Sequence, residues 1–203
     1  TIAALRAAGR AVICYFSAGS WEEWRPDADD YPPVVLGNEL DGWPGERWVD
    51  IRRLDLLGPI LEARLDLAHT KGCSGVEPDN VDAYQSSSGF PLTAADQLVF
   101  NRWLAARAHA RGLSVGLKND LDQIPDLVGD FDWALDEQCW EYDECQQLAP
   151  FAAAGKAVFG VEYTGDPQEF CPPLNAMGYS WLKKDLDLGP WRFDCRDVTR
   201  RPE

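Results

Sequence analysis

Polar and mostly acidic side chains follow the short apolar runs of this 203-residue sequence. At or just beyond the ends of these runs stand Asp50, Glu77, Asp79, Asn80, Asp82, Lys118, Asn119, Asp120, Glu137, Glu162 and Tyr163. Crowded carboxylates either share protons, so that one serves as an acid while another stays ionised, or they hold a divalent cation. From these residues alone, both kinds of chemistry remain open.

The aromatic residues favour a carbohydrate as the substrate. Nine tryptophans and six tyrosines are many for this length, and Trp43 and Trp140 lie in segments without helix or strand periodicity. Flat aromatic faces suit sugar rings, and hydrolysis of a glycosidic bond uses two carboxyl groups. One protonates the leaving oxygen, while the other attacks the anomeric carbon or activates water. Lys118 would keep a neighbouring carboxylate ionised for the second role.

Strand-like and helix-like segments alternate along the chain. The predicted strands are 11–16, 47–51, 74–77, 113–117, 131–135, 156–161 and 179–182, and the predicted helices are 56–71, 94–110, 124–128, 144–154 and 167–177. Four helices are each followed by a glycine just before a strand, at Gly72, Gly112, Gly155 and Gly178. Thr93 with Asp96 is typical of a helix start. Residues 21–46 carry four prolines and no periodicity, which predicts an ordered loop.

This alternation predicts an α/β fold with a mostly parallel sheet, either open or closed into a barrel. The phosphate-binding motifs of open sheets, G-x-G-x-x-G and G-x-x-x-x-G-K-[ST], are absent, which favours a (β/α)8 TIM-like barrel. Catalytic groups of such barrels come from the carboxyl ends of the strands. Seven strands are predicted where a barrel has eight, and the chain opens in a helix-like segment. We therefore expect at least the first strand to precede Thr1.

Length and charge exclude several functions. The chain fits one domain, residues 1–203, and 19 basic against 34 acidic residues give a formal charge of -15. This charge would repel nucleic acids and attract a polycation. No apolar run approaches the roughly 20 residues of a membrane helix, so no membrane insertion is expected.

The six cysteines favour an oxidising compartment. They have irregular spacing without C-x-x-C, and with only two histidines there is little material for a zinc site, so no metal is predicted. Disulfides explain an even cysteine count better. Six cysteines allow fifteen pairings, and short separation favours Cys139 with Cys145 and Cys171 with Cys195.

Several motifs in order along the chain resemble glycoside-hydrolase family 114, the endo-α-1,4-polygalactosaminidases. They are Cys14-Tyr-Phe-Ser-Ala-Gly19, Glu23-Trp-Arg-Pro-Asp27, Gly42-Trp-Pro-Gly-Glu46, Trp48-Val-Asp-Ile-Arg52, Gly75-Val-Glu-Pro-Asp-Asn-Val-Asp82, Gly116-Leu-Lys-Asn-Asp120, Glu137-Gln-Cys139 and Val161-Glu-Tyr163. The resemblance covers residues 10–165. It implies a secreted (β/α)-barrel that cleaves α-1,4-linked galactosamine polymers internally and requires no cofactor.

The resemblance also implies a catalytic pair. It points to Asp79 as the nucleophile and Glu137 as the general acid/base of a retaining reaction, on two strands 58 positions apart. Deacetylated galactosamine is cationic, so Glu77, Asp82, Asp120 and Glu162 are predicted to bind its ammonium groups. Asn80, Lys118, Asn119, Tyr163, Asp50, Trp43 and Trp140 complete the predicted substrate-binding set. The chain departs from the family pattern in having Ser74 in place of a common acid and Asp136 in place of a common Asn.

Two other functions compete with a cofactor-free glycosidase. The aromatic loops would also suit a non-catalytic polysaccharide-binding module, which would retain substrate without producing new reducing ends. The closely spaced Glu77, Asp79, Asp82 and Asp120 would suit a divalent-metal hydrolase, which a chelator would inactivate. In each case we expect a monomer.

Overall fold

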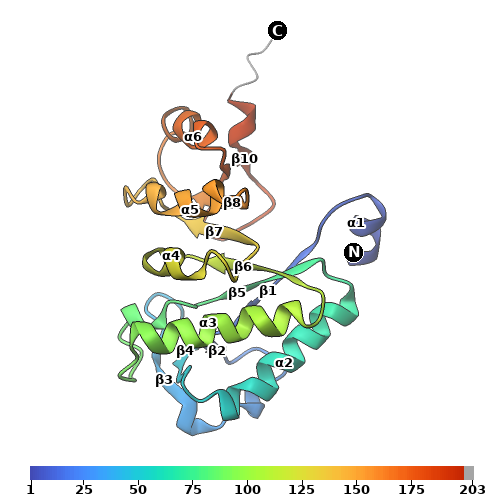
Figure 1. Ribbon diagram of the computed structural model, residues 1–203, viewed down its shortest axis with the longest axis vertical. Helices are drawn as coiled ribbons and strands as arrows, with labels where there is room; N and C mark the ends of the chain where they lie inside the picture. Colours follow the sequence, from blue (N-terminus) through green and yellow to red (C-terminus); the bar gives the residue numbers. More distant parts are fainter. Residues whose placement is uncertain (199–203) are drawn as a thin grey trace. The chain divides into compact units, whose positions relative to one another are not determined.

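The computed structural model describes residues 1–198, so the last five residues of the predicted 1–203 domain lie outside the described part (Figure 1). The chain divides into two compact units, residues 1–131 and the residues from 132 onward. Each unit is described by itself below.

The first unit is built on three parallel strands. Strands β1 (Ile13–Ser17), β5 (Gly75–Asp79) and β6 (Ser114–Lys118) lie in the order β1-β5-β6. The register pairs Ser17 with Asp79 and Gly75 with Ser114. Helices α2 (Leu54–Lys71) and α3 (Ala94–His109) lie side by side and pack on β5 and β6, respectively (Figure 1). Two short helices, α1 (Ile2–Ala7) and α4 (Ile124–Leu127), complete the unit.

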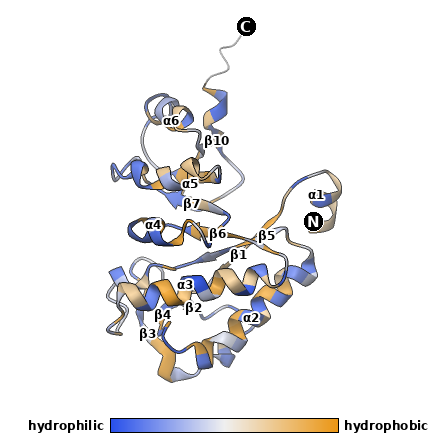
Figure 2. Ribbon diagram, viewed as in Figure 1, coloured by the Kyte–Doolittle hydropathy of each residue, from blue (hydrophilic) through white to orange (hydrophobic). Residues whose placement is uncertain are grey.

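Local signals explain where the two long helices begin and end. The Thr93 hydroxyl accepts a hydrogen bond from the Asp96 N–H, and the Asp96 carboxylate accepts one from the Thr93 N–H, which closes a capping box on α3. Helix α2 ends at Gly72, whose φ of 81° is costly for other residues. Hydrophobic and hydrophilic residues alternate along both helices, as expected for helices that bury one face (Figure 2).

A small antiparallel sheet corrects two predictions. The stretch 21–46, predicted to be a loop, contains most of β2 (Ser20–Glu22) and all of β3 (Leu36–Glu39). Residues 47–51 were predicted to be a parallel strand, but β4 (Glu46–Val49) pairs antiparallel with both, in the order β2-β4-β3. The hydrophobic pattern could not show this, because the strands are only three or four residues long and their buried side chains include the carboxylates of Glu22 and Glu46.

The second unit repeats the parallel arrangement. Strands β7 (Trp133–Glu137), β8 (Ala157–Glu162) and β9 (Ser180–Lys183) are parallel, and β10 (Phe193–Asp194) adds antiparallel to β9. Helix α5 (Ala149–Ala153) packs on β8, and α6 (Pro167–Ala176) packs on β9. The buried Trp181 ring lies over Gly160, where a Cβ would come within 2.0 Å of the ring. Only glycine allows this approach.

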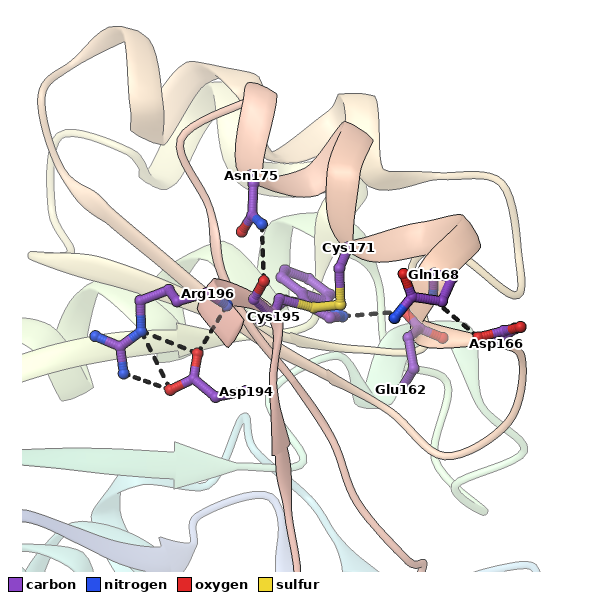
Figure 3. The surroundings of a disulfide bond; sticks show 9 residues. Glu162, Asp166, Gln168, Cys171, Asn175, Asp194, Cys195 and Arg196 are labelled. Carbon is purple, nitrogen blue, oxygen red and sulfur yellow. Dashed lines mark hydrogen bonds and ion pairs between the residues drawn. A yellow bond between two sulfur atoms is a disulfide. The ribbon is translucent and has the colours of Figure 1, made fainter. Parts of the chain in front are cut away.

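Three disulfides tie these elements together. Cys139–Cys145 and Cys171–Cys195 confirm the two predicted pairs. The third disulfide, Cys14–Cys73, joins β1 to the short connection between α2 and β5. Figure 3 shows the Cys171–Cys195 bond between α6 and the turn after β10, where the Asn175 side chain also donates to the Cys195 carbonyl at 2.9 Å.

The α/β class with mostly parallel strands is therefore confirmed. Within residues 1–198, six strands are parallel rather than the seven predicted, since residues 47–51 belong to the antiparallel sheet. No helix within this range is both long and apolar enough to cross a membrane.

Candidate active site

Glu77, Asp79 and Lys118 meet where β5 and β6 end. Because side chains alternate along a strand, Glu77 and Asp79 lie on the same face of β5. The Lys118 ammonium group lies 3.3 Å from Glu77 Oε1 and 3.4 Å from Asp79 Oδ1, and Lys118 is only 4% exposed. The buried Lys118 ammonium group is thus close to two carboxylates, and the sequence analysis had expected it beside at least one.

Two further donors fix the Asp79 carboxylate. The Tyr15 hydroxyl donates to Oδ2 at 3.0 Å, and the Asn80 N–H donates to Oδ1 at 2.8 Å. Hydrogen bonds from several directions restrict the rotation of this carboxylate. Asp79 has the environment of a nucleophile or a base.

Asn80 anchors the turn that follows Asp79. Its φ of 59° is uncommon for a residue other than glycine, and its amide donates to the hydroxyls of Ser17 at 2.8 Å and Ser20 at 3.2 Å. The backbone of Gly19 comes so close that a Cβ there would lie 1.7 Å from the Asn80 carbonyl oxygen. The two chain segments therefore fix each other, which explains the Ser17-Ala-Gly-Ser20 sequence after β1.

Asp82, which is half-buried, and Asp120, which is buried, form an acidic pair next to this group. Burial, and then the charge of Asp79, raises the pKa of Asp82 to about 6. Burial, followed by the charges of Asp82 and Asp122, raises the pKa of Asp120 to about 8. The Asn101 amide donates to Asp120 at 2.9 Å. With this pKa, Asp120 is mostly protonated and uncharged at neutral pH.

Asn119 and Asp120 share an unusual backbone. Their φ values are 50° and 47°, two consecutive left-handed residues directly after β6. Such strain collects at functional sites, where the surrounding structure holds it in place.

The small antiparallel sheet contributes two buried carboxylates. Glu22 and Glu46 are direct cross-strand partners, an arrangement that is unfavourable for two like charges. Arg25 satisfies Glu22 with two hydrogen bonds, and the Ser20 hydroxyl donates to Glu46 at 2.8 Å. Burial is the main reason that the pKa of Glu46 is raised, and the charges of Glu22 and Asp79 add to it.

The two other predicted residues of the first unit lie in this part of the fold. Asp50 follows β4 rather than a parallel strand, and both its carboxylate oxygens accept hydrogen bonds from Arg52. Trp43 is exposed in the connection between β3 and β4.

In the second unit, Glu137 ends β7 and accepts a hydrogen bond from the Tyr163 hydroxyl. Tyr163 directly follows β8, so the parallel pairing of β7 with β8 brings the two side chains together. Sequence analysis had selected both residues, and the structure places them in contact. Glu137 thus has a tyrosine donor, as Asp79 does.

Glu162 forms a buried network beside this pair. One of its oxygens accepts hydrogen bonds from the Trp140 N–H at 3.0 Å and the Trp181 indole N–H at 3.2 Å. Burial raises the pKa of Glu162, and these two hydrogen bonds partly oppose the shift. Glu162 therefore fixes the backbone that carries Trp140, whose ring is exposed.

Sequence analysis missed Tyr15, Ser20 and Glu46 as site residues. Tyr15 lies in the middle of a strand, so a search restricted to strand ends overlooks it. The period of two along β1 was the available signal, because it places Tyr15 on the same face as Ser17. Among the described residues, no three His, Cys, Asp or Glu side chains are placed to hold a metal ion together.

Carboxyl groups at the carboxyl ends of parallel strands are typical of glycoside hydrolases with this kind of fold. The chain belongs to glycoside-hydrolase family GH114, whose profile matches residues 1–200. Its fold is similar to that of Ega3 from Aspergillus fumigatus, solved in complex with galactosamine. The two sequences are 42% identical, with a TM-score of 0.87 over 96% of this chain and 82% of that chain.

One further solved structure and one sequence relative extend the comparison. The glycoside hydrolase domain of PelA from Pseudomonas aeruginosa is 15% identical, with a TM-score of 0.71 over 95% of this chain and 85% of that chain, and it shares the fold. An uncharacterized protein of Deinococcus radiodurans is 29% identical over 182 residues, which cover 79% of this chain and 58% of that protein. The chain thus spans less than two thirds of this relative's length.

Proposed function

We propose that this protein is a retaining endo-glycosidase that hydrolyses α-1,4-linked galactosamine polymers, with Asp79 as the nucleophile and Glu137 as the general acid/base. The similarity to Ega3, a protein of the same fold with 42% identity that was solved with galactosamine, carries the choice of substrate. Family membership and the hydrogen bonds to the two carboxylates support the choice of reaction.

In this mechanism the two carboxyl groups exchange roles between two steps. Asp79 attacks the anomeric carbon while the bond to the leaving oxygen breaks, and Glu137 gives its proton to that oxygen. The product is a glycosyl ester on Asp79. Glu137 then takes a proton from water, whose oxygen attacks the anomeric carbon and releases the Asp79 carboxylate. Both substitutions invert the anomeric centre, so the overall reaction retains its configuration.

The charge of the protein supports a cationic substrate. An ammonium group on the sugar ring is attracted by acidic residues around the reacting carboxylates, and the formal charge of the chain is -15. Glu77 and Asp82 lie beside Asp79 and are partly exposed, so they are the nearest candidates for this contact. Asp120 and Glu162 are buried and would act through their neighbours.

Release of reducing ends from partly deacetylated α-1,4-galactosaminoglycan tests the function, with chitosan as a second polycation. We expect release from the first polymer only. Asp79→Asn and Glu137→Gln should each lower kcat by about 10³-fold or more, because each removes a group that takes part in bond making or proton transfer. Asp30→Asn, at an exposed site, serves as the matched control and should retain full activity.

A chemical rescue separates the roles of the pair. Azide should restore turnover of Asp79→Ala and give a glycosyl azide of inverted configuration, because azide replaces the missing nucleophile. Near-normal turnover in Asp79→Asn would contradict the assignment. Binding without release in the wild type would identify a polysaccharide-binding module, and complete loss of activity after chelation would identify a metal hydrolase.

We further propose that residues 1–203 act as a single, monomeric catalytic domain in an extracellular setting. The three disulfides support an oxidising compartment. Sedimentation of the purified protein and its detection in culture medium would test both points.

A further inference from the structure

Tyr15 reaches Asp79 from the neighbouring strand. The register of β1 with β5 places Tyr15 beside Glu77 and Ser17 beside Asp79, so the tyrosine lies diagonally one step before the carboxylate. Side chains at alternate positions share a face of the sheet, and diagonal neighbours are within reach of a long aromatic residue. The 3.0 Å bond between the hydroxyl and Asp79 Oδ2 is the result.

The two carboxylate oxygens of Asp79 have different hydrogen-bond and ion-pair partners. Oδ1 accepts from the Asn80 N–H at 2.8 Å and lies 3.4 Å from the Lys118 ammonium group, while Oδ2 accepts from Tyr15. An attacking oxygen needs a lone pair that is free to form the new bond. Oδ2, with its single described donor, meets this requirement better than Oδ1.

The hydroxyl of Tyr15 remains a donor over a wide pH range. Burial of its hydroxyl group, and then the negative charge of Asp79, raises the pKa of Tyr15 well above its ordinary value. The residue as a whole is still 47% exposed. Replacing the hydroxyl by hydrogen should therefore disturb the fold little.

We infer that Tyr15 is a positioning residue that holds Asp79 Oδ2 towards the anomeric carbon, an inference that rests on the proposed function. The phenol stabilises the charged carboxylate before attack and again when the glycosyl ester breaks and charge returns to the oxygen. It touches Asp79 rather than the reacting sugar atoms, so it acts through the nucleophile.

Kinetics of Tyr15→Phe test the inference. Hydrogen bonds to charged groups contribute about 1.5–3 kcal/mol, so kcat/KM should fall by roughly 10- to 100-fold. The loss should appear in kcat as well as in kcat/KM, because the phenol contacts the nucleophile rather than the bound sugar. Tyr142→Phe, at an exposed tyrosine of the second unit, is the matched control and should behave like the wild type. Wild-type activity in Tyr15→Phe, or a loss confined to KM, would overturn the inference.

A stability cycle tests the contact without any activity. Tyr15→Phe should lower Tm in the wild-type background but not in Asp79→Ala, where the hydroxyl has already lost its acceptor. Equal losses in both backgrounds would also overturn the inference. If the cycle shows coupling but the wild type cleaves no polymer, the proposed function fails, and with it the positioning role, while the hydrogen bond stands.

Discussion

Asp136 stands next to Glu137 but faces the other side of β7, because side chains alternate along a strand. It is only 1% exposed, and its Oδ1 atom has no hydrogen-bond partner among the residues that the structure describes. Burial is the main reason that its pKa is raised to about 8, and the charges of Glu144, Glu162 and Glu137 add to the shift. A buried carboxyl group of this kind makes stability depend on pH.

Replacing Asp136 by Asn should stabilise the protein at pH 8. The unfolded chain releases this proton near its ordinary pKa of 3.8, whereas the folded protein keeps it until about pH 8. The free energy of unfolding therefore falls as the pH rises from about 4 to about 8. At about 1.4 kcal/mol per pKa unit the whole shift would correspond to roughly 5 kcal/mol at pH 8. The buried amide group of Asn also lacks some of its hydrogen-bond partners and offsets much of this gain, so Asp136→Asn should raise the free energy of unfolding at pH 8 by about 1–2 kcal/mol.

Thermal unfolding at pH 5 and pH 8 measures the effect. The gain at pH 8 corresponds to about 3–6 °C in Tm, with a smaller change at pH 5. Asp185→Asn, at an exposed position of the same unit, should leave both values unchanged. An Asp136→Asn variant that is less stable than the wild type at pH 8 would show that the carboxylate is ionised and satisfied.

At the residue scale, the sequence identified groups that stand at strand ends. Glu77, Asp79 and Lys118 were selected for that reason, and the structure places both carboxylates within 3.4 Å of the Lys118 ammonium group. The contact of Glu137 with Tyr163 follows from the same rule on two adjacent strands. Tyr15 was missed because the search was restricted to strand ends. The period of two along β1 could have indicated its face, but its contact with Asp79 also depends on the register between β1 and β5, which a single sequence does not contain.

At the scale of elements, the predictions succeeded where local sequence signals mark the end of a helix. Helix α2 is capped at its C-terminus by Gly72, and helix α3 begins at the Thr93 capping box. Both signals act locally and are visible in the sequence. Strands β2 and β4 carry the buried pair Glu22 and Glu46, whose burial depends on Arg25 and Ser20. Partners of this kind come from tertiary structure, and so the polar stretch was predicted to be a loop.

We expect a disulfide to stabilise the protein more, the longer the chain segment that it closes. The loop-entropy relation gives about 4 kcal/mol for Cys14–Cys73, about 3 kcal/mol for Cys171–Cys195 and about 2 kcal/mol for Cys139–Cys145, whose separations are 59, 24 and 6 residues. Three variants, each with both cysteines of one pair replaced by alanine, test this order in denaturant unfolding. The largest loss is expected for Cys14→Ala/Cys73→Ala.

Unfolding of the reduced wild type provides the control for these variants. Reduction should remove more stability than any single pair of substitutions. If the shortest loop proved the most important, local packing of Cys139 and Cys145, both buried, would dominate over chain entropy.

At the scale of the whole molecule, the formal charge of -15 would attract the cationic polymer of the proposed function before any specific contact forms. Clustered charge raises the rate of encounter by factors of about 10 to 10³, and salt screens it over a Debye length of about 10 Å at 0.1 M. This property can be read from composition alone. It requires neither the register of the strands nor the positions of individual carboxylates.

Salt should therefore weaken catalysis in proportion to the charge of the substrate. Raising NaCl from about 20 mM to about 500 mM at pH 6 should lower kcat/KM for a highly deacetylated galactosamine polymer by about 10-fold or more. The same polymer after partial re-N-acetylation carries fewer ammonium groups and should respond by a smaller factor. Tm measured at each salt concentration controls for changes in the protein itself. Equal responses of the two polymers would mean that salt acts on the enzyme, and that the acidic surface serves a purpose other than attracting the substrate.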